Sequence, residues 1–373
     1  MTRVTPRSAD STELEERLAR TVSLADFEPM ARLSMEPAAF DYVAGGSWDE
    51  LTLADNVAAW RRYRLRPRVL VDVGSVDPST TMLGAAVSMP VAVAPMAIHG
   101  LAHPDGEIGT ACGAATAGVP FTLSTMASRS IEEVAAAVPD GRRWFQLYSQ
   151  VDAGVTRELM ERATAAGYSG IILTVDLPRL GYRDRDRRWA FELPALGNFG
   201  GDRHPTHATS RPTGDLLGPA AHATLTWDDL STLRSWSSLP IVLKGILTAE
   251  DARLGVEHGA DAIVVSNHGA RQLDRVAATA DALPEVLEAV DGRTEVWVDG
   301  GIRRGLDIAT AVALGARGVL VGRPMFWALA AGGQAGVERA LAVLREEFEI
   351  ALALLGAPTP ADLRREHVEH ATR

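Results

Sequence analysis

Ala262-Ile263-Val264-Val265-Ser266 is a short run of apolar, mostly β-branched residues that ends on a polar side chain. Such a run favours a buried strand. Seven further runs of this kind occur along the chain, at 90–95, 121–124, 144–147, 171–175, 240–244, 295–299 and 318–322. Near-continuous apolar strands are typical of a parallel sheet that is covered on both faces.

Helix-like stretches rich in Ala, Leu and Glu separate these runs, at 130–138, 156–166, 249–258, 280–290 and 306–314 among others. Eight strands alternating with helices most simply close into a (β/α)8 barrel of the α/β class. The chain has 373 residues, which one such domain can hold. We therefore predict a single barrel domain over 24–373, with helices at 24–66 before the barrel and a long amphipathic helix at 337–355.

Two segments depart from this regular pattern. Residues 1–23 begin with a polar stretch that lacks the apolar core of a signal peptide, and we expect a partly disordered extension there. The spacing between the fourth and fifth strands leaves room for an insertion at 184–225, rich in Gly, Pro, His and Arg. Because it follows a strand, it lies on the C-terminal side of the barrel, where active sites are found, and we expect a mobile lid.

The composition excludes several classes of partner. The net charge is −11 at pH 7, which disfavours binding to nucleic acid or an anionic membrane through bulk charge. No run of 18 apolar residues predicts a transmembrane helix. The single cysteine, Cys112, cannot form an internal disulfide and lies in a small-residue stretch that predicts a buried, inert thiol. We expect a cytoplasmic protein.

Polar residues follow seven of the eight predicted strands, at positions that meet at one mouth of a parallel barrel. At the last two ends, the stretch 299–305 (Asp-Gly-Gly-Ile-Arg-Arg-Gly) and Gly322-Arg323 combine glycines with arginines. Barrels often bind phosphate there, through main-chain N–H groups and guanidinium donors. Each glycine could equally end a strand for steric reasons, but the combination favours a phosphate, of either a substrate or a cofactor.

His268 and Arg271 lie three residues apart, just past the strand at 262–265. A histidine can accept a proton near neutral pH, and a planar guanidinium can hold a carboxylate. The simpler alternatives are a core histidine bonded to the main chain and an arginine in a surface ion pair.

These motifs resemble the FMN-dependent α-hydroxy acid oxidase and dehydrogenase family, which includes glycolate and lactate oxidases. The resemblance extends from Asp26 to Gly356, and the segment 266–274 is close to a family signature. Further matching motifs lie at 40–42, 102–107, 145–148, 173–179 and 243–245. The resemblance implies FMN as cofactor, a 2-hydroxy acid as substrate and a homotetramer. It also implies oxidation of an L-2-hydroxy acid to the 2-keto acid, with O2 reoxidising the flavin to give hydrogen peroxide.

The resemblance also assigns roles to the residues at the mouth. His268 would be the base, paired with Asp176, and Arg271 and Arg183 would hold the substrate carboxylate. Tyr42 and Tyr148 would bind the carboxylate and the hydroxyl. The residues implied for FMN are Ser124, Gln146 and Thr174 at the flavin edge, Ala97 and Ser266 against the ring, Lys244 beside N1 and O2, Asp299 at the ribityl chain, and Gly301, Arg303, Gly322 and Arg323 at the phosphate.

The chain departs from the family pattern at two positions. Met126 and Val43 stand where glycolate-type members carry aromatic side chains, which predicts a larger pocket and a longer or aryl acid such as mandelate. Three other functions stay open: a dehydrogenase with a quinone or protein acceptor, an FMN barrel isomerase without net redox chemistry, and a non-catalytic FMN-binding protein. Ala97 slightly favours oxidases and dehydrogenases over relatives that decarboxylate their product before release.

Two histidine pairs have metal-like spacing, His204 with His207 and His367 with His370. Neither has an obvious third ligand nearby, so we expect no metal site.

Overall fold

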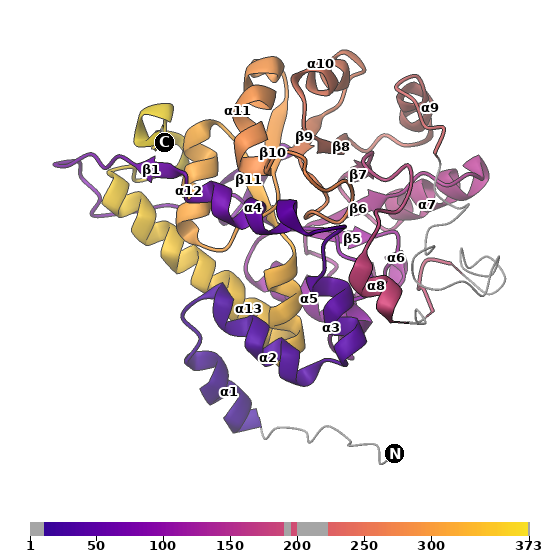
Figure 1. Cartoon of the computed structure of the whole chain (residues 1–373), viewed down its shortest axis with the longest axis horizontal. Helices are drawn as coiled ribbons and strands as arrows, with labels where there is room; N and C mark the ends of the chain where they lie inside the picture. Colours follow the sequence, from indigo (N-terminus) through magenta and orange to yellow (C-terminus); the bar gives the residue numbers. More distant parts are fainter. Residues whose placement is uncertain (1–10, 190–194, 200–222, 372–373) are drawn as a thin grey trace.

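The computed structural model describes residues 11–189, 195–199 and 223–371. Eight parallel strands close into a barrel in chain order, with the last strand returning to the first (Figure 1). They are β4 (Val91–Val93), β5 (Phe121–Ser124), β6 (Arg143–Leu147), β7 (Ile171–Thr174), β8 (Ile241–Ile246), β9 (Ala262–Val265), β10 (Glu295–Val298) and β11 (Gly318–Val321). Each lies at one of the eight predicted runs, and the predicted barrel is confirmed.

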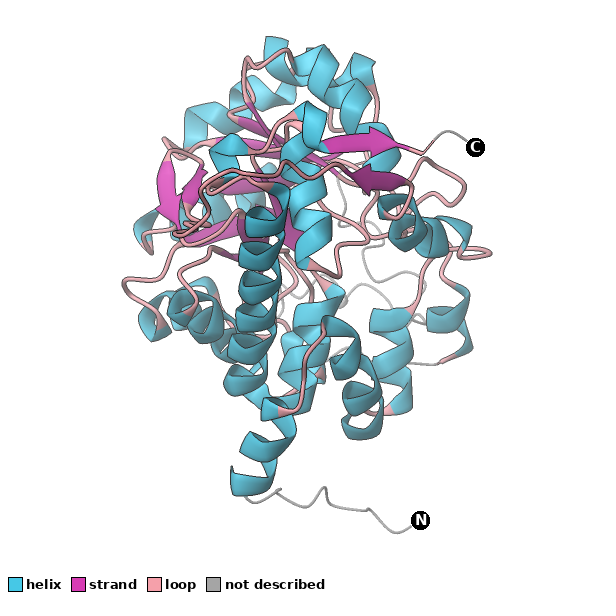
Figure 2. Ribbon diagram, turned by 90° about the vertical axis from the view of Figure 1, so that its left-hand side faces the viewer, coloured by secondary structure: helices cyan, strands magenta, loops and turns pink. Residues whose placement is uncertain are grey.

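Helices surround the strands, as Figure 2 shows. The crossovers hold α5 (Gly106–Thr116), α6 (Ile131–Ala137), α7 (Ala153–Ala165), α10 (Ala249–Glu257), α11 (Thr279–Val290) and α12 (Gly305–Leu314). Local sequence explains their starts: at α6, for example, Ser130 and Glu133 form a capping box that satisfies the first free N–H groups. The β7–β8 crossover carries α8 (Asp184–Arg188) and α9 (Asp229–Trp236). Most of the predicted lid, at 190–194 and 200–222, lies outside the described residues.

Four helices precede the barrel, of which the first two pack beside the last helix of the chain and the fourth packs against α11. They are α1 (Ser11–Ala19), α2 (Phe27–Ser34), α3 (Pro37–Ala44) and α4 (Leu51–Trp60). Helix α2 packs against α13 (Arg323–Leu355), which Gly332 and Gly333 interrupt with non-helical backbone angles (Figure 1). The helix predicted at 337–355 is the second half of α13. Of the predicted N-terminal extension, residues 11–19 form α1, and residues 1–10 lie outside the described residues.

Two small antiparallel sheets were not predicted from the sequence. Strands β2 (Thr80–Met82) and β3 (Ala85–Val87) form a hairpin, and β1 (Tyr63–Leu65) pairs with β12 (Val368–His370). Strands of three residues show too little alternation to be recognised. The hairpin has a clear function in packing, because Met82 and Val87 belong to the same buried cluster as the side chains inside the barrel.

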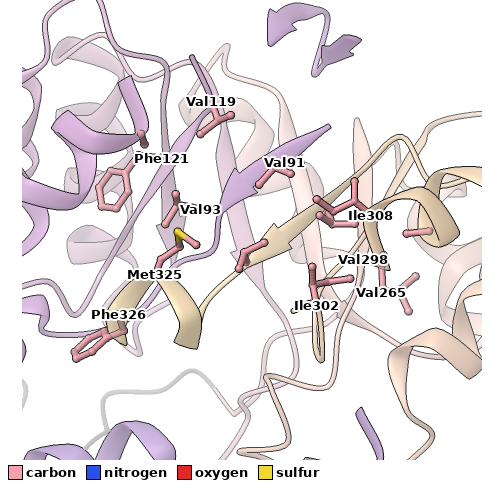
Figure 3. Close-up of a cluster of buried hydrophobic side chains, with 14 of the residues drawn as sticks. Val91, Val93, Val119, Phe121, Val265, Val298, Ile302, Ile308, Met325 and Phe326 are labelled. Carbon is pink, nitrogen blue, oxygen red and sulfur yellow. The ribbon is translucent and has the colours of Figure 1, made fainter. Parts of the chain in front are cut away.

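Side chains alternate between two cores along each strand. Outside, Val91, Val93, Phe121, Val265 and Val298 pack with residues of the surrounding segments, including Ile308, Met325 and Phe326 (Figure 3). Inside, Trp144 and Trp297 stack with ring centroids 4.8 Å apart. Because strand side chains repeat every two residues, Gln146 and Asp299, two positions further along, also point into the barrel, nearer to its mouth. The fold thereby places the polar strand ends in one ring.

Among the described residues, none of the helices combines the length and hydropathy needed to cross a membrane.

Candidate active site

Three polar side chains from neighbouring strands form a hydrogen-bonded row across one half of the barrel mouth. The Ser124 hydroxyl donates to Gln146 Oε1 over 3.1 Å, and Gln146 Nε2 donates to Thr174 Oγ1 over 3.0 Å. Strand register causes this arrangement, because Ser124 pairs directly with Gln146 between β5 and β6. Ser124 and Gln146 are almost fully buried.

A buried cation occupies the other half of the mouth. Lys244 Nζ lies 3.0 Å from Asp299 Oδ2 and donates to Ser266 Oγ over 2.9 Å. Burial alone would lower the pKa of Lys244, but Asp299 and Asp176 outweigh it and the pKa is raised, so the ammonium stays charged. Asp299 Oδ1 is also buried and has no hydrogen-bond partner within the described part of the chain. A ligand hydroxyl in the cavity could donate to it.

His268 and Asp176 form the pair that the sequence predicts. Their Nδ1 and Oδ1 atoms are 2.8 Å apart. Burial lowers the pKa of His268, with help from the charges of Lys244 and Arg183, while Asp176 opposes the shift. Burial would raise the pKa of Asp176, but His268 and Lys244 reverse this and lower it. At neutral pH the imidazole is therefore neutral and the carboxylate is ionised.

The backbone around His268 adopts an uncommon conformation. His268 and Ala270 have φ angles of +59° and +63°, in the left-handed region that residues other than glycine rarely adopt. The turn is supported from behind, because Asn56 and Asn267 exchange two amide hydrogen bonds of 2.9 and 2.8 Å. Such strain persists only where surrounding contacts hold it, and it is frequent at functional sites.

Two arginines and two tyrosines lie beside His268. Arg271 Nη1 donates to the main-chain oxygens of Tyr42 (2.6 Å) and Gly45 (2.9 Å). Burial and the Arg271 charge lower the pKa of Arg183 to about 10. The Tyr148 hydroxyl lies 3.4 Å from His268 Nε2. Burial raises the pKa of Tyr148, so the phenol keeps its proton and remains a donor. Two adjacent guanidinium groups and a phenol are suited to binding a carboxylate.

Two more arginines lie at the ends of β10 and β11. Burial lowers the pKa of Arg303 and of Arg323, and for Arg323 the neighbouring charges of Arg271 and Arg303 add to this effect. Arg323 donates to the main-chain oxygens of Val43, Gly269 and Gly45. These hydrogen bonds hold the guanidinium but do not neutralise it, so the charge favours a bound anion.

One cavity, open to solvent at its mouth, joins these groups. Every predicted site residue lines it except Asp176 and Ser266. Asp176 lies behind His268. Ser266, expected against the cofactor ring, is fully buried and accepts hydrogen bonds from Lys244 and from the main-chain N–H of His268. Ser266 therefore contributes by positioning these two residues.

Several lining residues were not identified as site residues from the sequence: Met96, Ile98, Leu177, Leu180 and Phe326. Leu177 was inside a quoted motif, and Phe326 lies one helical turn after Arg323, so spacing could have pointed to both. Leu180 reaches the cavity through the path of an irregular loop, which no periodicity predicts.

Of the two histidine pairs with metal-like spacing, the structure describes only His367 and His370. Across the described residues there is no group of three or more His, Cys, Asp or Glu side chains that could hold a metal ion. His367 and His370 are among these residues, whereas His204 and His207 lie outside them.

Comparisons with known proteins agree with this geometry. A family model described as FMN-dependent dehydrogenase matches residues 31–370. L-lactate oxidase from Nostoc sp. (strain PCC 7120 / SAG 25.82 / UTEX 2576) is 46% identical over 355 residues, covering 93% of this chain and 97% of the relative. Glycolate oxidase from Spinacia oleracea is 46% identical over 348 residues, covering 92% and 94%. A solved structure of mandelate oxidase with (S)-4-hydroxymandelic acid is 43% identical, with a TM-score of 0.88 and coverage of 94% and 98%.

The close packing at Gly301 gives a first prediction. Gly301 has a φ of +82°, and a Cβ atom there would overlap the main-chain carbonyl of Asn56. We expect Gly301→Ala to lower the free energy of unfolding by more than the ~1–2 kcal/mol of left-handed strain alone, and to weaken binding of phosphate-bearing ligands. Gly292→Ala is the matched control, because Gly292 has a φ of +67° and open space around it. Equal losses in chemical denaturation would contradict the packing argument.

Proposed function

The chain belongs to the FMN-dependent dehydrogenase family, and from this premise we propose that it is an oxidase of L-2-hydroxy acids that transfers electrons to O2. The products would be the 2-keto acid and hydrogen peroxide. The observation that carries the proposal is that His268, held from behind by Asp176, lines the same cavity as Arg183 and Arg271. A proton acceptor beside a carboxylate clamp matches the two functional groups of a 2-hydroxy acid.

The cavity fits the FMN that the family uses. Arg303 and Arg323 provide buried positive charge for a phosphate, beside the glycine-rich turn at 300–301. Asp299 Oδ1 offers an unused acceptor for a ribityl hydroxyl, and Lys244 offers a cation for the pyrimidine edge. When bound, FMN supplies the two-electron acceptor that no amino-acid side chain provides.

His268 is proposed to accept the substrate proton at Nε2. The other ring nitrogen, Nδ1, is engaged with Asp176, so the neutral ring donates from Nδ1 and leaves the lone pair of Nε2 available. Proton transfer produces an imidazolium ion, which the Asp176 carboxylate stabilises at 2.8 Å. Tyr148 lies on the Nε2 side and would donate to the substrate oxygen.

Arg183 and Arg271 are proposed to bind the substrate carboxylate. Without a ligand the two positive charges repel each other. This repulsion, together with burial, lowers the pKa of Arg183 below its ordinary value. A bound carboxylate relieves this repulsion, because one anion lies between two cations. Tyr42 borders the same part of the cavity and would add a hydroxyl donor.

The substrate proposed is a large or aryl acid, such as mandelate. Val43, Met126, Leu177 and Leu180 contribute aliphatic and thioether groups to the cavity wall. Met126 is flexible and could accommodate a ring, with which its sulfur can make favourable contacts. The similar mandelate oxidase structures, one of them with (S)-4-hydroxymandelic acid, support this choice. The lactate and glycolate oxidase relatives keep small acids as the competing possibility.

The decisive test combines two mixing experiments on the purified FMN-bound protein. Anaerobic mixing with a panel of L- and D-2-hydroxy acids should bleach the flavin absorbance with the L-acids only. Mixing the reduced protein with air should then restore the colour within seconds and yield hydrogen peroxide. Colour that returns only after minutes in air, but quickly with a quinone, would assign a dehydrogenase. A flavin that no hydroxy acid bleaches would exclude both activities.

Substitution of Asp176 should change both rate and pH dependence. With Asp176→Asn, we expect kcat to fall by about 100-fold, because the imidazolium loses its stabilising carboxylate. Since Asp176 raises the pKa of His268, its loss should lower that pKa further and move the acidic limb of kcat/KM to lower pH. The measurement is kcat/KM against pH, with the exposed Asp228→Asn as control. An acidic limb that moves upward would argue against His268 as the base.

Substitution of Met126 tests the size of the substrate. Met126→Trp should reduce kcat/KM for mandelate by about tenfold or more relative to glycolate, because the indole would fill space that the aryl ring needs. Met126→Leu preserves the volume and should retain the wild-type preference. The measurement is steady-state kinetics with both acids. A wild-type enzyme with a higher kcat/KM for glycolate than for mandelate would contradict the proposal.

A further inference from the structure

We propose that Gln272 is a positioning residue, whose side-chain amide connects the two active-site loops and aligns Asp176 with His268 and Arg183 with Arg271. The two loops are residues 266–274, which follow β9, and residues 175–183, which follow β7. Gln272 does not line the cavity, so it would act through other residues. Its kinetic consequences rest on the function proposed above, whereas its structural role can be tested without it.

All four hydrogen bonds of the Gln272 amide reach the same loop. Nε2 donates to the main-chain oxygens of Asp176 (2.9 Å) and Arg179 (2.8 Å). Oε1 accepts from the main-chain N–H of Gly181 (3.1 Å) and from Arg183 Nη2 (3.4 Å). A primary amide has two donor hydrogens and two acceptor lone pairs, so its capacity is fully used. The residue is only 7% exposed, and water therefore competes little for these bonds.

The loop that Gln272 holds has no regular secondary structure between β7 and α8. It carries Asp176, the partner of His268, and then Leu177 and Leu180 in the cavity wall, and it ends at Arg183. Without a ladder or a helix, the main-chain groups of such a loop need other partners. Gln272 supplies partners at three points of the loop, at its start, middle and end.

Contacts on both sides keep the amide in place. The Ser47 hydroxyl donates to the main-chain oxygen of Gln272 (2.5 Å), and the Ser47 main-chain N–H donates to that of Ala270 (3.0 Å), which fixes the loop that carries the amide. Across the junction, Arg183 Nε donates to the Arg271 carbonyl over 3.0 Å. At Gly181 the two backbones touch, since a Cβ atom there would lie 2.8 Å from the Gln272 carbonyl oxygen. The amide thus acts between two rigidly opposed segments.

These four hydrogen bonds of Gln272, called the brace below, matter for chemistry because proton transfer depends steeply on geometry. Asp176 can orient and stabilise the His268 ring only while the two atoms remain at hydrogen-bond distance. A displacement of about 1 Å in a positioned group can cost on the order of 100-fold in rate. Because the same loop also carries Arg183, loss of the brace should disturb the carboxylate clamp together with the base.

Two variants test the brace with different perturbations. Gln272→Met keeps the approximate length of the side chain and removes all four hydrogen bonds. Gln272→Glu keeps the shape and turns a donor into an acceptor that faces two carbonyl oxygens. The control is Tyr168→Phe, which removes one buried hydrogen bond, from the Tyr168 hydroxyl to the Ile131 carbonyl, at the opposite end of β7. This control reports the effect of losing a buried hydrogen bond remote from the site.

For both Gln272 variants we expect FMN content near that of the wild type and a 10-fold to 100-fold loss of kcat/KM. The dissociation constant of the 2-keto acid product, followed by flavin absorbance, should rise about tenfold, because Arg183 is displaced. In Gln272→Met, which adds no charge, the acidic limb of kcat/KM should move to lower pH, because a misaligned Asp176 no longer raises the His268 pKa fully. Tyr168→Phe should change thermal stability and none of these three quantities.

The positioning role would be overturned if kcat/KM and the product dissociation constant stayed within twofold of the wild type and the acidic limb did not move, while thermal stability fell as in Tyr168→Phe. If Gln272→Met does not fold, the isosteric Gln272→Glu carries the test. Hydrogen exchange of the 175–183 segment gives a readout that needs no catalysis, and it should speed up by at least tenfold in both variants. Should the wild type fail to oxidise any hydroxy acid, the proposed function fails, and unchanged exchange in the variants would separately refute the brace.

Discussion

The buried ion pair between Lys244 and Asp299 is the interaction on which the electrostatics of the site depend. A lysine that is only 5% exposed remains charged because the Asp299 carboxylate lies 3.0 Å from its Nζ atom. Its charge in turn lowers the pKa values of both Asp176 and His268. One cation therefore helps to keep the carboxylate ionised and the imidazole neutral, which is the protonation state that a base at this position requires. Removing either partner would leave an unpaired buried charge.

The alternation of strand side chains explains why the same sequence segments form both the core and the site. Trp144 and Gln146 lie on the same face of β6, and Asp299, directly after the end of β10, continues the face that carries Trp297. The inner position of each pair stacks with its counterpart, whereas the outer position faces the mouth. This is why the eight strands and the polar ring could be predicted from short runs of sequence. The position of each polar side chain at the mouth follows from the two-residue period of the strand and from the residue at which each apolar run ends.

Features that depend on loop paths could not be predicted in the same way. The β2–β3 hairpin, whose strands have three residues each, gives no periodic signal, although Met82 closes the interior of the barrel. Ser266 follows a strand and was expected at the cavity surface, but it is fully buried and bonded to Lys244 and to the main-chain N–H of His268. The places of Leu180 and Gln272 follow from contacts between two irregular loops, and such contacts are defined only in the folded chain.

The charge of the cavity is opposite to the charge of the whole protein. The chain carries a net charge of −11, yet four arginines and Lys244 border one cavity. Ionic screening over about 8 Å at physiological salt limits the long-range repulsion of an anionic substrate, so the nearby guanidinium groups dominate once the acid enters. The two arginine pairs differ in how they are held: Arg323 is bonded to three main-chain carbonyls, whereas Arg183 is held through the loop that Gln272 braces. The first guanidinium is fixed by the main chain alone, whereas the second depends on the alignment of two loops, so a change at Gln272 would disturb the proposed carboxylate clamp and leave the proposed phosphate site in place.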